Sequence, residues 1–428
     1  MIDLNLLREN PDLFKRACAS KNSSVDIDRL VFLDSERRRV QQELDGVNAE
    51  RKEAGKNRDV EKGRELKDRA AVLEAETAKI EEEFRPLVLS VPNLPSSDTP
   101  VGKDDSENVV LRQWGTKRDF GFAPKDHMAL GEGLGIIDTE KATEVSGTRF
   151  AYLKGDLVLM QYALQQLAFS VVTHEGTLKT IIERAGLSVP STPFVPVAPP
   201  LMIRPDVFLK MARLEPKDER YYLPADDLFL IGSAEHTLGP IHMGETLKES
   251  QLPARYVAFT PAFRREAGSY GKDTKGILRL HQFDKVEMES FTAPEAGLAE
   301  QDLFVAIQEH LMQALGIPYQ VVMTCTGDQG DPDARHLDIE SWMPGQDKYR
   351  ETHSSDYMTD YQTRRLGTKV KRADGSSQFV HTNDATAFAV GRTMIAILEN
   401  YQEADGSIRV PEALIPLMGK DVMHKTVS

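Results

Sequence analysis

The segment PAFRREAGSYGKDTKGILRLHQFDKVEMESF, residues 261–291, is the most informative part of the sequence. It concentrates basic side chains in a chain whose formal net charge is −14, and glycines lie among them. The residues concerned are Arg264, Arg265, Lys272, Lys275, Arg279, Gly268, Gly271 and Gly276. Two strands joined by a basic, glycine-containing loop can surround a polyphosphate, because arginine forks bind phosphate oxygens in pairs. Phe283 then offers a flat face to a base, with Glu266 and Glu287 flanking. Composition alone also allows a solvated basic hairpin.

The segment HTNDATAFAVGRTMIAILENYQ, residues 381–402, carries another arginine in apolar surroundings. Ala, Met, Ile and Leu recur at helical spacing over 384–402, which predicts a helix with Arg392 one or two turns inside it. A guanidinium among small and apolar residues is costly unless it meets an anion. Arg392 therefore indicates either an anionic ligand or an internal salt bridge with a carboxylate.

The segment QDKYRETHSSDY, residues 346–357, places Glu351 and Ser354 three residues apart in a predicted polar loop or strand end. A carboxylate together with a hydroxyl suits Mg²⁺, a hard cation that is often shared with substrate phosphates. The alternative interpretation of these residues is a solvated loop that binds no metal.

The rest of the chain from about residue 110 has a mixed α/β pattern. Helices are predicted at 156–173 and 296–315, and strands at 255–259, 284–291, 318–323 and 337–343. Clustered strands followed by a closing helix favour an antiparallel sheet in an α+β domain.

Residues 26–88 have a different character. Apolar residues follow an alternating three-and-four spacing on both sides of a break at Gly55–Gly63, which predicts two helices paired antiparallel. Asp26 or Ser24 could cap the first helix, and Pro86 and Pro92 should help to end the second. Such a hairpin is either a spacer or dimerisation coiled coil, or an arm that reaches a large partner. The stretch SVPNLPSSDTPVGKDDSEN, residues 90–108, is typical of a linker.

Composition narrows the class of protein. The 428 residues are 40% apolar and 28% charged, which is ordinary for a soluble globular protein. The sequence contains no uninterrupted apolar stretch of about 18 residues, so we expect no membrane-spanning helix. The N-terminal residues mix acidic side chains with apolar ones, so we expect no secretory signal there. Two distant cysteines, Cys18 and Cys325, offer neither a disulfide framework nor a cysteine zinc site, so we expect no zinc and a cytoplasmic location. The acidic net charge confines any RNA binding to local basic patches.

Together these segments resemble the seryl-tRNA synthetases, a family of class II aminoacyl-tRNA synthetases. FRREAGSYGKDTKGILRLHQFDKVE resembles motif 2 of that family and FAVGRTMIAILENYQ its motif 3, while VPNLPSSDTPVG and RFAYLKGDLVLMQYAL resemble the link to the catalytic domain and its entry. The resemblance covers nearly the whole chain. It implies an N-terminal tRNA-binding domain over 1–95 with a helical hairpin arm, a linker over 96–110, and an antiparallel-sheet catalytic domain over 111–428. It also implies a homodimer, with motif 1 running from the helix that ends near Gly186 to Pro199–Pro200.

The resemblance also implies roles for single residues on the nucleotide side. Arg264 should hold the α-phosphate and the serine carboxylate, Glu266 should contact the adenine amino group, and Phe283 should stack on the adenine. The outer phosphates should meet Arg279 and Arg392. The Mg²⁺ that accompanies ATP should be coordinated by Glu351 and Ser354.

On the amino-acid side, the resemblance implies that Glu287 faces the serine ammonium and that Thr386 reads the serine hydroxyl. Ser233 and Glu235 correspond to the family's Thr-x-Glu loop. Three departures stand out: Ser233 replaces the usual Thr, THSSD at 352–356 replaces Ile-Ser-Ser-Cys-Ser, and Asp384 replaces the usual Asn in the serine site. The last change matters most, because Asn donates and accepts hydrogen bonds whereas ionised Asp only accepts them.

The implied activity is that of a serine–tRNA ligase. L-serine reacts with ATP to give seryl-adenylate and pyrophosphate, and the serine is then transferred to the 3′-terminal adenosine of tRNA(Ser), with tRNA(Sec) as a second candidate. The arm would grip the long variable arm of the tRNA. The alternatives are a ligase that loads an amino acid onto a carrier protein, and an inactive synthetase-like paralogue with a binding or regulatory role. The intact hairpin opposes the first, and the presence of the arginines, Phe283 and Glu351 opposes the second.

Overall fold

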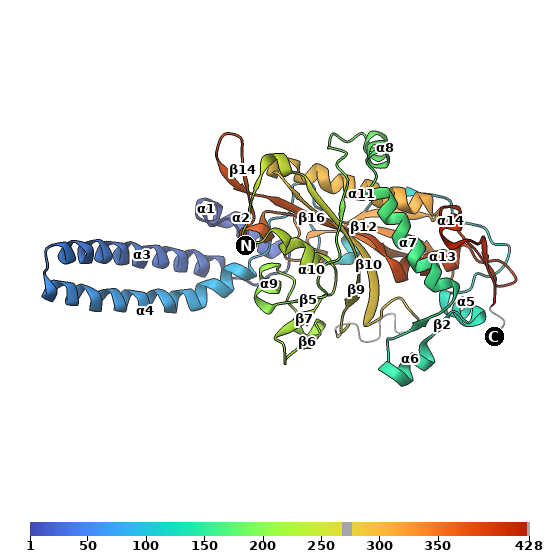
Figure 1. Ribbon diagram of the computed structural model, residues 1–428, viewed down its shortest axis with the longest axis horizontal. Helices are drawn as coiled ribbons and strands as arrows, with labels where there is room; N and C mark the ends of the chain where they lie inside the picture. The colour runs from blue at the N-terminus through green and yellow to red at the C-terminus, as the bar shows by residue number, and fades with distance from the viewer. Residues whose placement is uncertain (268–275, 426–428) are drawn as a thin grey trace.

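The computed structural model describes residues 1–267 and 276–425. Two long helices project from a larger body that is built around a sheet (Figure 1). The predicted loop residues Gly268, Gly271, Lys272 and Lys275 lie outside the described residues, so the loop between the two strands of 261–291 is described only at its ends.

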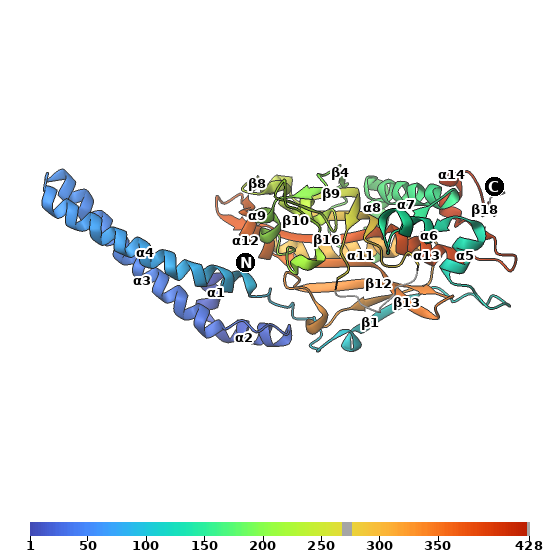
Figure 2. The same cartoon turned by 90° about the horizontal axis from the view of Figure 1, so that it is seen from below.

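The N-terminal part is entirely helical. It comprises α1 (Leu4–Glu9), α2 (Pro11–Ser20), α3 (Ile27–Lys56) and α4 (Val60–Ser90). Asp26 caps α3 by accepting a hydrogen bond from the Arg29 N–H, and Asp59 caps α4 in the same way from the Lys62 N–H. Because α3 has 30 residues, the hairpin is about 45 Å long. The antiparallel pair predicted at 26–88 is therefore present, and Figure 2 shows it projecting from the body at an angle.

One detail of that prediction is wrong. Pro86 lies inside α4, which continues to Ser90. Phe84 before it and Val88 after it are both buried in the same apolar cluster at the base of the arm. That packing stabilises the last turn although Pro86 cannot donate a helical hydrogen bond.

The hairpin has two separate apolar clusters. The arm cluster lies along the outer part of α3 and α4 and consists of Val40, Leu44, Val47, Ala54, Leu66, Ala70 and Leu73. The base cluster joins α1 and α2 to the inner ends of α3 and α4, and it includes Tyr361 of the body. The outer arm can therefore be shortened without removing the contacts that fix its base.

The body is built on an eight-stranded sheet with the order β1-β11-β12-β13-β16-β10-β9-β4. Its strands are β1 (Val109–Trp114), β4 (Val195–Pro196), β9 (Ala254–Phe263), β10 (Gln282–Thr292), β11 (Tyr319–Met323), β12 (Arg335–Met343), β13 (Lys348–Thr359) and β16 (His381–Ala389). Neighbours pair antiparallel except β4 and β9, which pair in parallel. The predicted α+β class with an antiparallel sheet is confirmed.

Helices α7 (Asp156–Val172), α8 (Glu175–Ala185), α11 (Gly297–Ala314) and α13 (Val390–Asn400) supply side chains to the main apolar core, which also includes Val286 and Met288 of β10. Because side chains alternate along a strand, Lys285, Glu287 and Glu289 point to the opposite face of the sheet. The face of the sheet opposite the apolar core therefore carries polar and charged side chains.

Smaller elements complete the body. They are α5 (His127–Leu134), β2 (Ile137–Asp138), α6 (Thr139–Ser146), β3 (Tyr152–Leu153), β5 (Met202–Ile203), α9 (Pro205–Lys210), β6 (Tyr222–Leu223), β7 (Leu228–Leu230), α10 (Glu235–Leu238), β8 (Thr246–Lys248), α12 (Tyr361–Leu366), β14 (Lys369–Lys371), β15 (Ser377–Phe379), β17 (Ile408–Arg409), α14 (Ile415–Met418) and β18 (Val422–Met423). Across the described residues, we find no helix that combines the length and apolar character needed to cross a membrane.

The helices predicted at 156–173 and 296–315 and the four predicted strands coincide with α7, α11, β9, β10, β11 and β12. The helix predicted over 384–402 is wrong in its first part, because residues 384–389 belong to β16. This strand lies between β13 and β10 inside the sheet, where pairing on both sides overrides the helical propensity of its alanines. Arg392 consequently lies in the first turn of α13 rather than one or two turns inside it.

Candidate active site

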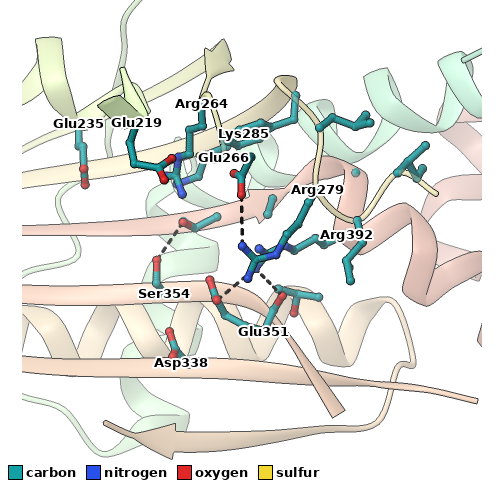
Figure 3. A pocket seen from close by; sticks show the side chains of 18 of the residues that line it. Glu219, Glu235, Arg264, Glu266, Arg279, Lys285, Asp338, Glu351, Ser354 and Arg392 are labelled. Atoms are coloured by element: carbon teal, nitrogen blue, oxygen red, sulfur yellow. Dashed lines mark hydrogen bonds and ion pairs between the residues drawn. The ribbon is translucent and has the colours of Figure 1, made fainter. Parts of the chain in front are cut away.

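A cavity of about 660 Å³ lies on the polar face of the sheet. The predicted residues that line it come from separate segments of the chain: Glu235, Arg264, Glu266, Arg279, Phe283, Glu351, Ser354, Thr386 and Arg392. Figure 3 shows Arg264, Arg279 and Arg392 reaching this space from different elements. Arg264 and Arg279, from the described ends of the basic segment, thus meet Arg392 of α13 at one site.

The arginines on the nucleotide side are held by neighbouring oxygen atoms. Arg279 Nη1 donates to Glu266 Oε2 at 3.2 Å, and Arg264 Nε donates to the Gly232 carbonyl at 3.1 Å. Arg392 Nη1 lies 3.1 Å from Glu351 Oε2 and donates to the Glu351 carbonyl at 3.0 Å. The Glu351 carboxylate raises the pKa of Arg392, so this side chain stays charged. These contacts fix three cations around a space that suits a polyanion.

Phe283 lies at the cavity wall and not in the apolar interior. Its ring is half-buried, and the guanidinium carbon of Arg264 lies 5.4 Å from the ring centroid. Phe283 is thus available to a flat ring that enters the cavity, beside a cation that can meet the attached phosphate.

Glu351 and Ser354 both lie within β13, and the prediction of a loop or strand end is wrong. Side chains three residues apart in a regular strand point to opposite faces. Here the pairing of β13 with β12 shifts register between Ile339 and Glu340, a bulge that brings both side chains to the cavity. A carboxylate and a hydroxyl form an all-oxygen donor set, which fits Mg²⁺.

The amino-acid side of the cavity is built on a buried carboxylate. Glu287 is 1% exposed. It accepts a hydrogen bond from Thr386 Oγ1 at 3.1 Å and forms an ion pair with Lys285. Burial raises the pKa of Glu287 from its ordinary value, while Lys285 opposes that rise. Ser233 is also buried, and its hydroxyl lies 3.5 Å from Lys285 Nζ. Lys285 and Thr386 line the cavity, whereas Ser233 and Glu287 do not line it and lie buried in contact with them.

Asp384 is buried beneath the cavity, 2% exposed. Its Oδ2 lies 3.6 Å from Arg213 Nη2, and Glu235 Oε1 lies 3.3 Å from Arg213 Nε. The carboxylate that departs from the family pattern is thus directed to an internal arginine.

Sequence reasoning missed several lining residues, among them Arg213, Arg220, His236, Lys285 and Asp338. Lys285 could have been found, because it shares one face of the predicted strand 284–291 with Glu287. Arg213 gave no local signal, since its contacts are to residues distant in the sequence.

Comparison with known proteins agrees with this geometry. The family described as tRNA synthetase class II core domain (G, H, P, S and T) matches residues 221–401, and the seryl-tRNA synthetase N-terminal domain matches residues 1–95. The fold is that of a class II aminoacyl-tRNA synthetase.

Proteins that are similar over nearly the whole chain narrow the class to one family. A serine–tRNA ligase of Fervidobacterium nodosum is 38% identical, with 99% of each chain covered, and one of Dehalococcoides mccartyi is 41% identical over 99% of this chain and 100% of the relative. A seryl-tRNA synthetase structure from Pyrococcus horikoshii, complexed with ATP, has a TM-score of 0.89 and 36% identity, with 100% of both chains covered. The chain belongs to the seryl-tRNA synthetase family.

Proposed function

We propose that this chain is a serine–tRNA ligase, which activates L-serine with ATP and transfers it to tRNA(Ser). The observation that carries the proposal is the division of one cavity into two chemical halves. Arginines and Phe283 form one half, suited to a nucleotide, and the buried pair of Glu287 and Thr386 supports the other, suited to a small hydroxyl amino acid. The family relationship agrees with both halves.

In the first step, the serine carboxylate attacks the α-phosphorus of ATP in line, and pyrophosphate leaves. Arg264 neutralises charge on the α-phosphate, and Arg279 and Arg392 hold the outer phosphates. Glu351 and Ser354 would hold the Mg²⁺ that accompanies ATP, and this ion would neutralise further phosphate charge. Positioning and electrostatics suffice, so no side chain needs to act as a nucleophile.

In the second step, the 3′-hydroxyl of the terminal adenosine of the tRNA attacks the adenylate carbonyl, and AMP leaves. Selection of serine depends on its hydroxyl. Thr386 and Glu287 present a hydrogen-bonded pair that serine can join, whereas alanine would leave polar groups unpaired. Glu235 and Glu287 supply negative charge for the serine ammonium.

Further features of the proposal concern the whole chain. We divide it into a tRNA-binding domain over 1–95, a linker over 96–110 and a catalytic domain over 111–428, and we place it in the cytoplasm, where tRNA is charged. A homodimer through motif 1 is supported by Val195 of β4, an apolar side chain that is exposed within that segment. Sedimentation equilibrium would then give twice the 47.8 kDa of one chain. A charging assay with purified tRNA(Sec) decides whether that tRNA is also a substrate.

The direct test of activation is ATP–pyrophosphate exchange with each of the twenty amino acids. We expect exchange with serine and a loss of about a thousandfold or more in Arg264→Ala, because the variant lacks the cation at the reacting phosphate. Arg265→Ala is the matched control, since Arg265 lies instead against Tyr221, 5.7 Å from its ring centroid. Exchange that survives in Arg264→Ala would contradict the role of Arg264. Absence of exchange with every amino acid would favour an inactive paralogue.

A further inference from the structure

Buried carboxyl groups form a cluster beneath the amino-acid side of the cavity. We define this acidic cluster as Glu235, Glu289, Asp333, Asp356 and Asp384. Asp384 is the register partner of Glu289 in β10 and of Asp356 in β13, so three acidic residues lie side by side across the centre of the sheet. Glu289 is 0% exposed. Burying several carboxylates together is costly unless a cation lies among them.

Arg213 provides that cation. It follows α9, and its side chain is 15% exposed. Its Nε lies 3.3 Å from Glu235 Oε1, and its Nη2 lies 3.4 Å from Asp333 Oδ1, 3.2 Å from Asp356 Oδ2 and 3.6 Å from Asp384 Oδ2. One guanidinium thus contacts four carboxylates, which the planar fork of arginine permits.

The four carboxylates depend on Arg213 to different degrees. Asp356 also contacts His336, and Asp333 also accepts a hydrogen bond from the Gly330 N–H at 3.0 Å. Asp384 Oδ2 accepts no hydrogen bond from any residue that the structure describes. Its 3.6 Å contact with Arg213 places a cation beside this oxygen.

We propose that Arg213 is a positioning residue for the amino-acid half of the site. Its guanidinium fixes Glu235 for the substrate ammonium, and it turns Asp384 away from the substrate carboxylate. The inference rests on the proposed function and deepens it. It also gives a physical reason why this chain can carry Asp384 where its family usually has Asn. Burial and the nearby Glu235 and Asp356 raise the pKa of Asp384 well above its ordinary value, and Arg213 is the cation that opposes this rise and balances the carboxylates that stay ionised.

Two consequences distinguish this role from general structural support. Loss of Arg213 should weaken serine binding far more than ATP binding, since the arginines of the nucleotide half are held by other partners. The loss should also matter less when residue 384 is uncharged, because Asn at 384 adds no carboxylate that needs a cation.

The experiment uses the full chain and four variants: Arg213→Gln, Arg213→Lys, Asp384→Asn and the double variant Arg213→Gln/Asp384→Asn. Pyrophosphate exchange is measured with serine and ATP varied separately, and thermal melting reports folding. Arg335→Gln is the matched control. Arg335 is 11% exposed and contacts Asp98 at 2.9 Å and Asp302 at 2.8 Å, so it is a comparably buried arginine with carboxylate partners of its own.

We expect Arg213→Gln to raise the KM for serine about tenfold or more and the KM for ATP by less than about twofold. Arg213→Lys should recover part of the loss, because lysine keeps the charge but lacks the fork. In the Asp384→Asn background, the effect of Arg213→Gln on serine KM should shrink to about a third or less. Arg335→Gln should leave the ratio of the two KM values as in the wild type.

Equal increases in both KM values, or the same effect of Arg213→Gln in both backgrounds, would overturn the proposal. If Arg213→Gln does not fold, the double variant decides: a folded double variant with the serine KM of Asp384→Asn supports the coupling, and an unfolded one refutes it. Wild-type exchange with serine is the reference throughout. Absence of wild-type exchange with serine would count against the proposed function. Normal wild-type exchange, together with Arg213 variants that raise both KM values equally, would count only against the positioning role of Arg213.

Discussion

Buried His236 lies between the backbone and Glu235, and its two ring nitrogens have different partners. The Gly232 N–H donates to Nδ1 at 3.0 Å, and Nε2 lies 3.3 Å from Glu235 Oε1. A neutral ring with its proton on Nε2 satisfies both contacts. Burial lowers the pKa of His236 to about 4, although Glu235 opposes that shift. The neutral histidine thus helps to fix Glu235 at Oε1, the oxygen that Arg213 also contacts.

This arrangement predicts a specific loss of stability in acid. Below a pH of about 6.5 the unfolded chain binds a proton at His236 that the folded chain does not bind until about pH 4. The free energy of unfolding should therefore fall as the pH falls through this window, by up to about 1.4 kcal/mol per pH unit from this group. Urea denaturation between pH 7.5 and 4.5 should show a shallower fall for His236→Asn than for the wild type.

The control for this measurement is His174→Asn. His174 lies at the surface and caps α8 by accepting a hydrogen bond from the Thr177 N–H, a role that Asn also fills. Its pH dependence should match that of the wild type. A wild-type slope in His236→Asn would contradict the assignment of a neutral, buried His236.

At the level of helices and strands, the arm was predictable because its cause is local. The apolar seam of Val40, Leu44 and Val47 and the cap at Asp26 can be seen in the sequence, and the structure contains both. Residues 384–389 were not predictable in this way, since alanine-rich letters favour a helix while pairing with β13 and β10 makes them a strand. The bulge in β13 that orients Glu351 and Ser354 likewise depends on a partner strand.

The same distinction holds in the site. Arg264, Arg279 and Arg392 were predicted from dense or apolar local contexts, and they line the cavity. Arg213 was not predicted, because its significance depends on carboxylates from four other segments. Contacts of long sequence separation are the part that patterns in a single sequence do not carry.

The arm offers a prediction about the second step of the reaction. Replacing residues 41–74 with a short turn removes most of the arm cluster and keeps Leu30, Leu33 and Phe84 of the base cluster. We expect serine-dependent pyrophosphate exchange to be retained. Charging of tRNA(Ser) should fall about a hundredfold or more in kcat/KM, equivalent to about 3 kcal/mol of lost interaction. Charging by the intact chain should also weaken steeply with salt, as expected of phosphate contacts.

The control for the truncation is Gly46→Ala. A Cβ at Gly46 would meet no atom within 4 Å among the described residues, so this change keeps the length and charge of the arm. It should leave charging intact. Loss of both exchange and charging in the truncated chain would show that the outer arm is needed for folding, and unchanged charging would show that it does not bind the tRNA.

Across the whole molecule, the arm base is fixed to the catalytic body near the amino-acid side of the cavity. Lys21, which follows α2, donates to the Gly330 carbonyl at 3.0 Å and to the Asp333 carbonyl. Burial lowers the pKa of Lys21 to about 8, with Asp333 opposing the shift. Asp333 in turn contacts Arg213 through its side chain. The helical arm, the acidic cluster and the cavity are therefore joined through direct contacts.

The central claim is that the basic segment 261–291 and the start of α13 enclose one adenylate. The most direct test is a crystal structure with a non-hydrolysable sulfamoyl analogue of seryl-adenylate. We predict that the adenine stacks on Phe283, that the sulfamoyl group meets Arg264, and that the serine ammonium faces Glu287. An adenine bound away from Phe283, or an analogue held outside the cavity that Arg264 and Arg392 line, would contradict the account.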